Sequence, residues 1–477
     1  MEMICLLRED LKERALSIIE LPNDFHLLAE DYLEEDGVMF VWENEGQDES
    51  ITIHVNSSGD LISLSIDRKD KNSTQIHLSI EERKELAEQF LLSYYPNALN
   101  DFIFTRKNEE TDCIRFYYEQ IVLDLPLEDA GCFIEVDRVG NIIDFTYDGV
   151  AEIPEIPETL ILKERLIEDV RNKIDLQLTI ADLFADFHNV EKNGLHLVYE
   201  PKSFFISYKA NALKPTLTIE HEEDEQETYI PVTASSKPLI SKDLSIEEIV
   251  GIPNSMEVIR EIDAGDEIGR VWREPNWQMK EKDLSSTNFL SEDVEDTVNV
   301  FISKETGRMR SFSWFNERSG DLQLSREACY EKAIDFLQQV FPKYEQYLQL
   351  MVQENDEEDD GIKEWFLFPM HNGHGISLEL EMIMIVINST TGQVDHYSGP
   401  NVDVEKLYEI STEPAISKQE AKELFMENLD FELVWKKDYD SEKGSNFLVY
   451  EACERFTKRA IRYIDAITGK VITDQRV

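Results

Sequence analysis

The sequence is short of cysteine, and its few cysteines are far apart. They are Cys5, Cys113, Cys132, Cys329 and Cys453, an odd number in which no pair has the Cys-x-x-Cys spacing. This scatter excludes a recognisable zinc or redox motif and does not form a disulfide framework. We therefore expect reduced, mostly buried thiols, as in a protein of the cytoplasm.

Long hydrophobic runs are also lacking. No stretch approaches the roughly 18 apolar residues that a membrane-spanning helix needs. The residues after Met1 contain no basic region leading into an apolar stretch, so no secretory signal is recognised. The sequence predicts a cytoplasmic chain without a membrane partner.

Positive charge is scarce as well. The 47 basic residues face 99 acidic ones, which gives a formal net charge of −52. Nucleic acid and anionic membranes are excluded as expected partners, because both are bound by clustered Lys and Arg. Long-range attraction instead favours cationic partners, including basic peptides and divalent ions. The same charge can also serve solubility alone.

Motifs of catalysis are missing. The sequence has no His-Glu-x-x-His, no Gly-x-Ser-x-Gly and no Walker loop, and the segment from Gly265 to Gly269 lacks the lysine of a phosphate-binding loop. We therefore predict no enzyme activity, no cofactor and no catalytic, cofactor-binding or metal-binding residues. A catalytic site assembled from residues far apart in the sequence remains an alternative.

A pair of histidines is a weak candidate for a metal site. His371 and His374 have His-x-x-His spacing, but no third ligand is identifiable. Asn372 and Gly373 lie between them and are typical of a tight turn. A surface turn is therefore the favoured interpretation.

Two acidic runs are further candidates for cation binding. One extends from Asn355 to Gly361, but a calcium loop that starts at Asp356 would need glutamate where Leu367 stands. The other comes directly after His221. Solvated loops explain both runs better than metal sites do.

What the sequence does contain is an internal repeat over its whole length. The matches keep the same order in both halves, which indicates one tandem duplication. They pair Leu21-Pro22-Asn23 with Ile252-Pro253-Asn254, Trp42 with Trp272, Ser79 with Ser325, Phe90 with Phe336, and Leu197-Val198-Tyr199-Glu200 with Leu448-Val449-Tyr450-Glu451. The repeated aromatic residues Trp42, Trp272, Tyr199 and Tyr450 are expected to anchor the core rather than to bind a ligand.

The pattern within each half predicts an α+β protein of two lobes. Each lobe is expected to hold three units of one helix packed on a small, mainly antiparallel sheet. The boundaries are 1–77, 78–158 and 159–237 in the first lobe, and 238–322, 323–410 and 411–477 in the second. Helix starts are marked by the capping-box pairs Ser79 with Glu82, Ser245 with Glu248, and Ser417 with Glu420.

Hairpin turns close several of these units. Glycine at Gly140, Gly307, Gly392 and Gly469 comes after an Asp, Asn or Ser that can open the turn, and we expect a positive φ at these glycines. The third unit has no such glycine and is expected to have diverged from the sixth.

These motifs resemble a known family. The capped helix from Ile416 to Ala421, followed by strands and Asp465-x-x-Thr468-Gly469-x-Val471, resembles the PepSY domain. The three-unit arrangement, with Ile252-Pro253 after a helix and Asn372-Gly373 before a hairpin, resembles the YcdB/YcdC repeat family, a bacterial group related to PepSY. The resemblance implies a role in restraining a partner hydrolase, and it supplies no catalytic residues.

We therefore expect a non-catalytic binding or regulatory protein whose partner is a protein or a basic peptide, such as a peptidase that it restrains. An acidic structural scaffold without a small-molecule ligand is one alternative. An enzyme with an unrecognised site between the two lobes is the other. An exposed sheet edge would favour the binding protein, and a pocket with perturbed titrating groups would favour the enzyme.

Overall fold

The computed structural model describes most of the chain. The described ranges are 2–33, 37–46, 48–68, 77–202, 207–216, 228–232, 244–278, 295–315, 318–352, 362–402, 404–439 and 444–475. The acidic runs after His221 and from Asn355 to Gly361 lie outside these residues, as does the expected boundary between the lobes at 237–238.

The first part of the chain forms one eight-stranded sheet with helices on one side. Its strand order is β1-β2-β3-β4-β8-β7-β6-β5, with every neighbouring pair antiparallel. The strands are β1 (Phe25–Leu33), β2 (Gly37–Asn44), β3 (Ser50–Val55), β4 (Leu61–Asp67), β5 (Ile103–Glu109), β6 (Cys113–Val122), β7 (Leu125–Asp137) and β8 (Ile142–Gly149). The helices are α1 (Glu2–Leu16), α2 (Ile80–Tyr94) and α3 (Ala98–Asp101).

Alternating side chains explain why these segments form strands with one buried face. In β3, Ile51, Ile53 and Val55 are fully buried, and the residues between them are only partly covered. Helix α2 begins with the expected capping box, in which Ser79 and Glu82 satisfy each other's backbone N–H groups. The helix buries Ala87 and Leu91 on the core of this sheet.

The second half repeats this arrangement strand by strand. The order β13-β14-β15-β16-β20-β19, with β18 next to β19, matches β1-β2-β3-β4-β8-β7-β6. The elements are α5 (Ile246–Val250), β13 (Glu257–Ala264), β14 (Glu267–Arg273), β15 (Val298–Ser303), β16 (Met309–Trp314), α7 (Arg326–Val340), η1 (Tyr344–Gln346), β17 (Gln349–Val352), β18 (Lys363–His371), β19 (Ser377–Asn388) and β20 (Val394–Ser398). This correspondence supports the two-lobe duplication.

One feature differs from the sequence-based expectation. The first two expected units of each lobe do not have separate sheets, because β4 pairs with β8 and β16 pairs with β20. Each pair of units therefore shares one continuous sheet. The strands that join the units, β4 with β8 and β16 with β20, would be unpaired edges if each unit had a sheet of its own.

The third and sixth expected units exchange strands with each other. The third contains α4 (Lys163–Lys173), β9 (Leu176–Leu183), β10 (Gly194–Pro201), β11 (Ser207–Lys209) and the later β12 (Thr228–Pro231). The sixth contains α8 (Lys418–Asn428), β21 (Leu429–Lys437), β22 (Asn446–Glu454), β23 (Ile461–Asp465) and β24 (Val471–Thr473), after η2 (Val404–Glu409). Strand β10 pairs with β23, where Val198 lies opposite Asp465, and β11 pairs with β22, where Lys209 lies opposite Val449.

The contacts between these two units are reciprocal. Lys163, at the start of α4, pairs with Asp430 of the sixth unit at 3.2 Å. Lys418, at the start of α8, pairs in turn with Asp175 of the third unit. Repetition of the same contact in both directions indicates a pseudo-two-fold relation between the units.

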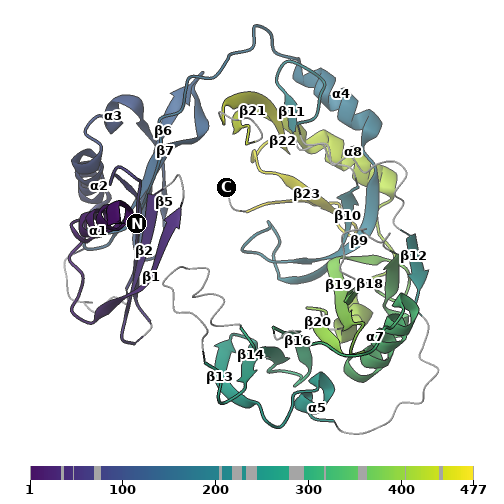
Figure 1. Cartoon of the computed structure of the whole chain (residues 1–477). Helices are drawn as coiled ribbons and strands as arrows, with labels where there is room; N and C mark the ends of the chain where they lie inside the picture. Colours follow the sequence, from purple (N-terminus) through teal and green to yellow (C-terminus); the bar gives the residue numbers. More distant parts are fainter. Residues whose placement is uncertain are drawn as a thin grey trace.

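The whole chain is arranged as an open ring (Figure 1). Helices α1, α2, α4, α7 and α8 lie on its outer side and the sheets lie toward its centre. One cluster of buried hydrophobic side chains lies between the first sheet and its helices. A second cluster extends without a break through the exchanged units and the second sheet. Of the helices in the described residues, none is both long and apolar enough to cross a membrane.

The turn glycines adopt the expected conformation. Gly140, Gly307, Gly392 and Gly469 have φ values of 97°, 67°, 69° and 75°. Each lies in the connection of a strand hairpin, so this prediction is confirmed.

We expect Gly140→Ala to destabilise the protein by about 3 kcal/mol and Gly307→Ala by only about 1 kcal/mol. A Cβ at Gly140 would lie 2.7 Å from Cδ1 of both Leu78 and Leu86, whereas a Cβ at Gly307 would meet no atom within 4 Å. Chemical denaturation of both variants measures the difference. Equal losses would contradict the steric explanation.

Candidate binding site: the free edge of the first sheet

Strand β5 is a fully exposed edge. It ends the eight-stranded sheet, and every residue from Ile103 to Glu109 is exposed. Its inner side pairs with β6. Within the described parts of the chain, no strand pairs with its outer side. Its outer N–H and C=O groups can therefore accept another polypeptide.

The equivalent edge of the second sheet is covered. Strand β17 lies beside β18 as β5 lies beside β6, and the residues just before them, Phe102 and Leu348, are both 1% exposed. Strand β12 pairs antiparallel with β17 along all four of its residues, from Thr228 opposite Val352 onward. The chain thus closes by strand addition the edge whose counterpart in the first sheet has no partner strand among the described residues.

Two cations contact aromatic rings on β5 and on its neighbour β6. The Lys84 Nζ atom lies 4.0 Å from the ring centroid of Phe104, and the Arg106 guanidinium carbon lies 4.0 Å from that of Tyr117. Thr105 donates a hydrogen bond to the Glu119 carboxylate. These contacts order the side chains of the edge while its outer backbone stays free.

A polar pocket of about 930 Å³ lies at the end of β5. Arg138 fixes the β5–β6 turn there, because its Nε donates to the Thr111 carbonyl at 3.0 Å. Acidic and basic groups both contribute to the wall. The lining residues are Arg106, Lys107, Asn108, Glu109, Glu110, Thr111, Asp112, Cys113, Tyr117, Arg459 and Gln475.

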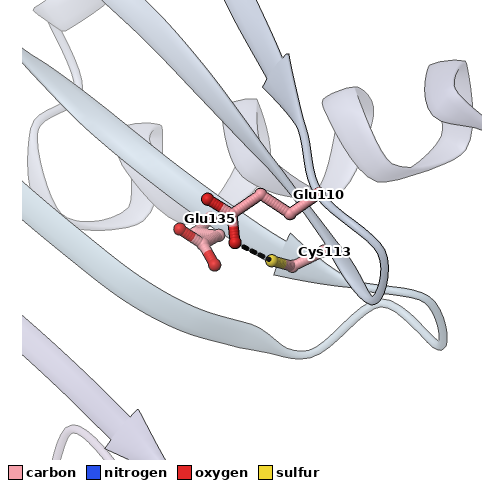
Figure 2. Close-up of side chains that lie close together, drawn as sticks. All are labelled: Glu110, Cys113 and Glu135. Atoms are coloured by element: carbon pink, nitrogen blue, oxygen red, sulfur yellow. Dashed lines mark hydrogen bonds between the residues drawn. The ribbon is translucent and has the colours of Figure 1, made fainter. Parts of the chain in front are cut away.

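Beside this pocket lies the one set of three potential metal ligands that converge within the described residues. Glu110, Cys113 and Glu135 have ligand atoms within 4.8 Å of one another and point toward each other (Figure 2). The Cys113 thiol donates to the Glu110 carboxylate at 3.9 Å. The Glu135 carboxylate accepts from Arg115 Nε at 2.7 Å.

The chemistry of this cluster is that of a hydrogen-bonded network. Burial, followed by the Glu135 carboxylate, raises the pKa of Cys113 to about 12. The thiol is therefore protonated at neutral pH, whereas a metal ligand must be a thiolate. Arg115 already neutralises Glu135 and also contacts Asp144 at 2.9 Å.

The histidine pair lies in a turn. His371 Nδ1 accepts from the backbone N–H of Gly373 at 3.0 Å, and Asn372 accepts from that of His374 at 3.0 Å. Burial lowers the pKa of His371. The surface-turn interpretation fits these contacts.

The repeated aromatic residues are in the core. Trp42 and Trp272 are each 3% exposed, and Tyr199 and Tyr450 are also buried. This agrees with the expected role as core anchors. An exposed sheet edge is expected of a binding protein, but the sequence does not place it at β5, because a sequence does not show which strands lack neighbours.

A pair of carboxylates was also missed. Glu200 on β10 and Glu379 on β19 interact, and Tyr463 donates to Glu379 Oε1 at 2.7 Å. Burial, followed by the Glu379 charge, raises the pKa of Glu200 to about 7. Arg462 is the basic group near Glu379, and its guanidinium binds Asp474 at 2.8 Å.

The equivalent carboxylates in the other half are balanced by a cation. Lys436 Nζ lies 3.6 Å from Glu128 and 3.4 Å from Glu451. Glu451 matches Glu200 in the sequence repeat. The position that matches Lys436 in β9 is occupied by the buried Ala181, so Glu200 has no lysine there.

Two proteins of Bacillus subtilis (strain 168) are similar to the chain along most of its length. The uncharacterized protein YcdB is 31% identical over 98% of this chain and 98% of its own. The uncharacterized protein YcdC is 28% identical over 91% of this chain and 93% of its own.

Among solved structures, the C-terminal domain of Bacillus megaterium YpeB covers 40% of this chain and 85% of its own length. Its identity is 14% and its TM-score is 0.26, and this similarity supports no argument about fold or function.

The family domain described as the YcdB, YcdC repeated domain matches residues 8–149 and 240–401. These two ranges contain the two equivalent sheets, from β1 to β8 and from β13 to β20, and leave out the strand-exchanged units. The chain belongs to the YcdB/YcdC repeat family.

Proposed function

We propose that this protein is a non-catalytic binding protein that takes an extended segment of a partner polypeptide by strand addition. One observation carries the proposal: the edge strands β5 and β13 are exposed at every residue. Strand addition gives affinity through main-chain hydrogen bonds and selectivity through side chains. An exposed sheet edge is the feature that favours a binding protein over a scaffold or an enzyme.

Charge supports a basic partner. The net charge of −52 attracts cationic segments from a distance. Along β13, Glu257, Glu261 and Asp263 are exposed and outnumber the single Arg260. Strand β5 itself carries two basic residues and one acidic residue, so the attraction to that edge comes from the rest of the chain. Electrostatic attraction of this kind mainly raises the association rate and weakens with salt.

Three further proposals accompany this function. The chain is divided into six PepSY-like units. Because neighbouring units share one continuous sheet, these units are building blocks of a larger fold rather than independent domains. The protein acts in the cytoplasm, supported by its five scattered cysteines, none of which has Cys-x-x-Cys spacing. Its partner is a hydrolase such as a peptidase, which it restrains, as the resemblance to PepSY implies.

An array of ten-residue basic peptides, probed with the full chain at low and moderate salt, tests the function. We expect saturable binding that weakens as salt increases. Each peptide is matched with a version that has proline at alternate positions, which cannot complete a strand ladder and should not bind. Equal binding of both versions, or no saturable binding at either salt concentration, would contradict the proposal.

A further inference from the structure

We infer that the free edge of β5 is the seat for one extended polypeptide segment, which adds antiparallel in the register that β12 holds on β17. The inference rests on the proposed function and names its site and the form of its ligand. The occupant is a strand of at least four residues with an aliphatic residue directly after it.

The equivalence of the two edges carries the register. In the first sheet, Ile103 pairs with Glu119 of β6. In the second sheet, Leu348 is the residue just before β17, and it pairs with Met370 of β18. Ile103 and Gln349 are therefore equivalent first residues of their strands. Gln349 lies opposite Pro231 of β12. A segment added to β5 should place its corresponding residue opposite Ile103. The equivalence holds as far as Phe104, because the register of β5 shifts between Phe104 and Arg106.

The proline in β12 indicates which backbone N–H groups of an added strand face the strand that it joins. Proline has no N–H, so it is tolerated where that group would point away from the neighbouring strand. By this rule we expect the nitrogen of Pro231 to point away from β17, and that of Tyr229, two residues earlier, to do the same. The N–H of Ile230, between them, faces β17. An occupant of β5 needs an N–H at the equivalent position.

The residue directly after β12 indicates the side chain that should come after the added strand. Val232 is 5% exposed and belongs to the same buried cluster as Leu348, at the start of β17. Around the start of β5, Leu99, Ile103 and Phe104 are 36%, 58% and 37% exposed. These side chains offer an open apolar contact to an aliphatic residue in that place.

Disulfide trapping tests the register on the full-length chain. The probe is a synthetic peptide with the sequence of residues 225–235, in which lysine replaces both glutamates, so that the peptide is basic, and cysteine replaces the residue at the Pro231 position. Only directly opposed residues approach within the Cα distances that a disulfide allows. We expect Ile103→Cys to capture this peptide on the order of tenfold faster than Leu123→Cys, a similarly exposed position in the β6–β7 turn, away from both open edges.

Two control probes distinguish strand addition from non-specific binding of the peptide. A probe with cysteine at the Thr228 position should not be trapped by Ile103→Cys, because its thiol would lie three residues away from the position opposite Ile103. A probe N-methylated at the Ile230 position should lose trapping, whereas N-methylation at the Tyr229 position should leave it intact. Rates are compared with those of the unsubstituted chain, which reports any reaction of its native cysteines.

A positive control uses the edge of β17, which β12 covers within the chain itself. The variant Gln349→Cys should trap the first probe only when Ile230→Pro is also present, because that change removes the N–H by which β12 holds β17. If this variant traps the probe and Ile103→Cys does not, the β5 seat is wrong while the peptide array still decides the proposed function. Trapping that ignores register or N-methylation would also overturn the inference.

Discussion

Replacement of Asp395 by alanine should destabilise the protein by about 3–5 kcal/mol, the cost of leaving one partner of a buried ion pair uncompensated. Asp395 is 5% exposed and accepts from Arg318 Nε at 2.8 Å. Asn388, also buried, donates to Asp395 at 3.1 Å and to the Arg318 carbonyl at 2.8 Å. The loss would leave the Arg318 guanidinium without its carboxylate partner and would remove one of the two acceptors of the Asn388 amide.

The matched control is Arg326→Ala. Its partner Glu364 lies at 2.6 Å, but both side chains are partly exposed, so we expect a loss below about 1 kcal/mol. Urea denaturation followed by fluorescence measures both variants. A loss for Asp395→Ala no larger than that for Arg326→Ala would show that the buried network contributes little.

Glu200→Gln should stabilise the protein at pH 8 by about 1–2 kcal/mol, a value reduced for the solvent that still reaches the half-buried carboxylate. The folded pKa of Glu200, about 7, lies above the ordinary value of 4.5. Folding therefore favours the protonated form. Below about pH 4.5, Glu200 is protonated in both states and costs the native state nothing. As the pH rises through 7, the native state loses stability because the buried carboxyl becomes charged. Above that, the full cost of the buried charge is present.

Thermal unfolding at pH 5 and pH 8 checks this prediction. The stabilisation by Glu200→Gln should shrink toward zero at pH 5. The control Glu451→Gln removes a carboxylate that Lys436 already pairs at 3.4 Å, so it should give no stabilisation at pH 8. A gain that is the same at both pH values would point to packing rather than to charge.

The sequence was informative wherever a local pattern determines structure. The capping pairs that begin at Ser79, Ser245 and Ser417 form as expected. The turn glycines have positive φ, and the order of the repeat predicted the duplicated lobes. Each of these features depends on residues close in sequence or on the likeness of the two halves.

Features that depend on strand order could not be predicted in the same way. Nothing local in the sequence shows that β4 pairs with β8, or that Val198 lies opposite Asp465. The β5 edge and the raised pKa of Glu200 arise from such distant pairings. The reciprocal contacts of Asp430 and Asp175 make Lys436 equivalent to Ala181, so the loss of a cation in one half became visible with the structure.

The strand exchange between the third and sixth units bears on how such a chain is made and how it arose. On the ribosome, β10 and β11 leave the tunnel long before their partners β23 and β22 exist. The same reciprocal pairing is what two separate half-length chains would form as a symmetric dimer. Gene fusion would then turn a concentration-dependent assembly into an intramolecular one, in which each half is always supplied with its partner.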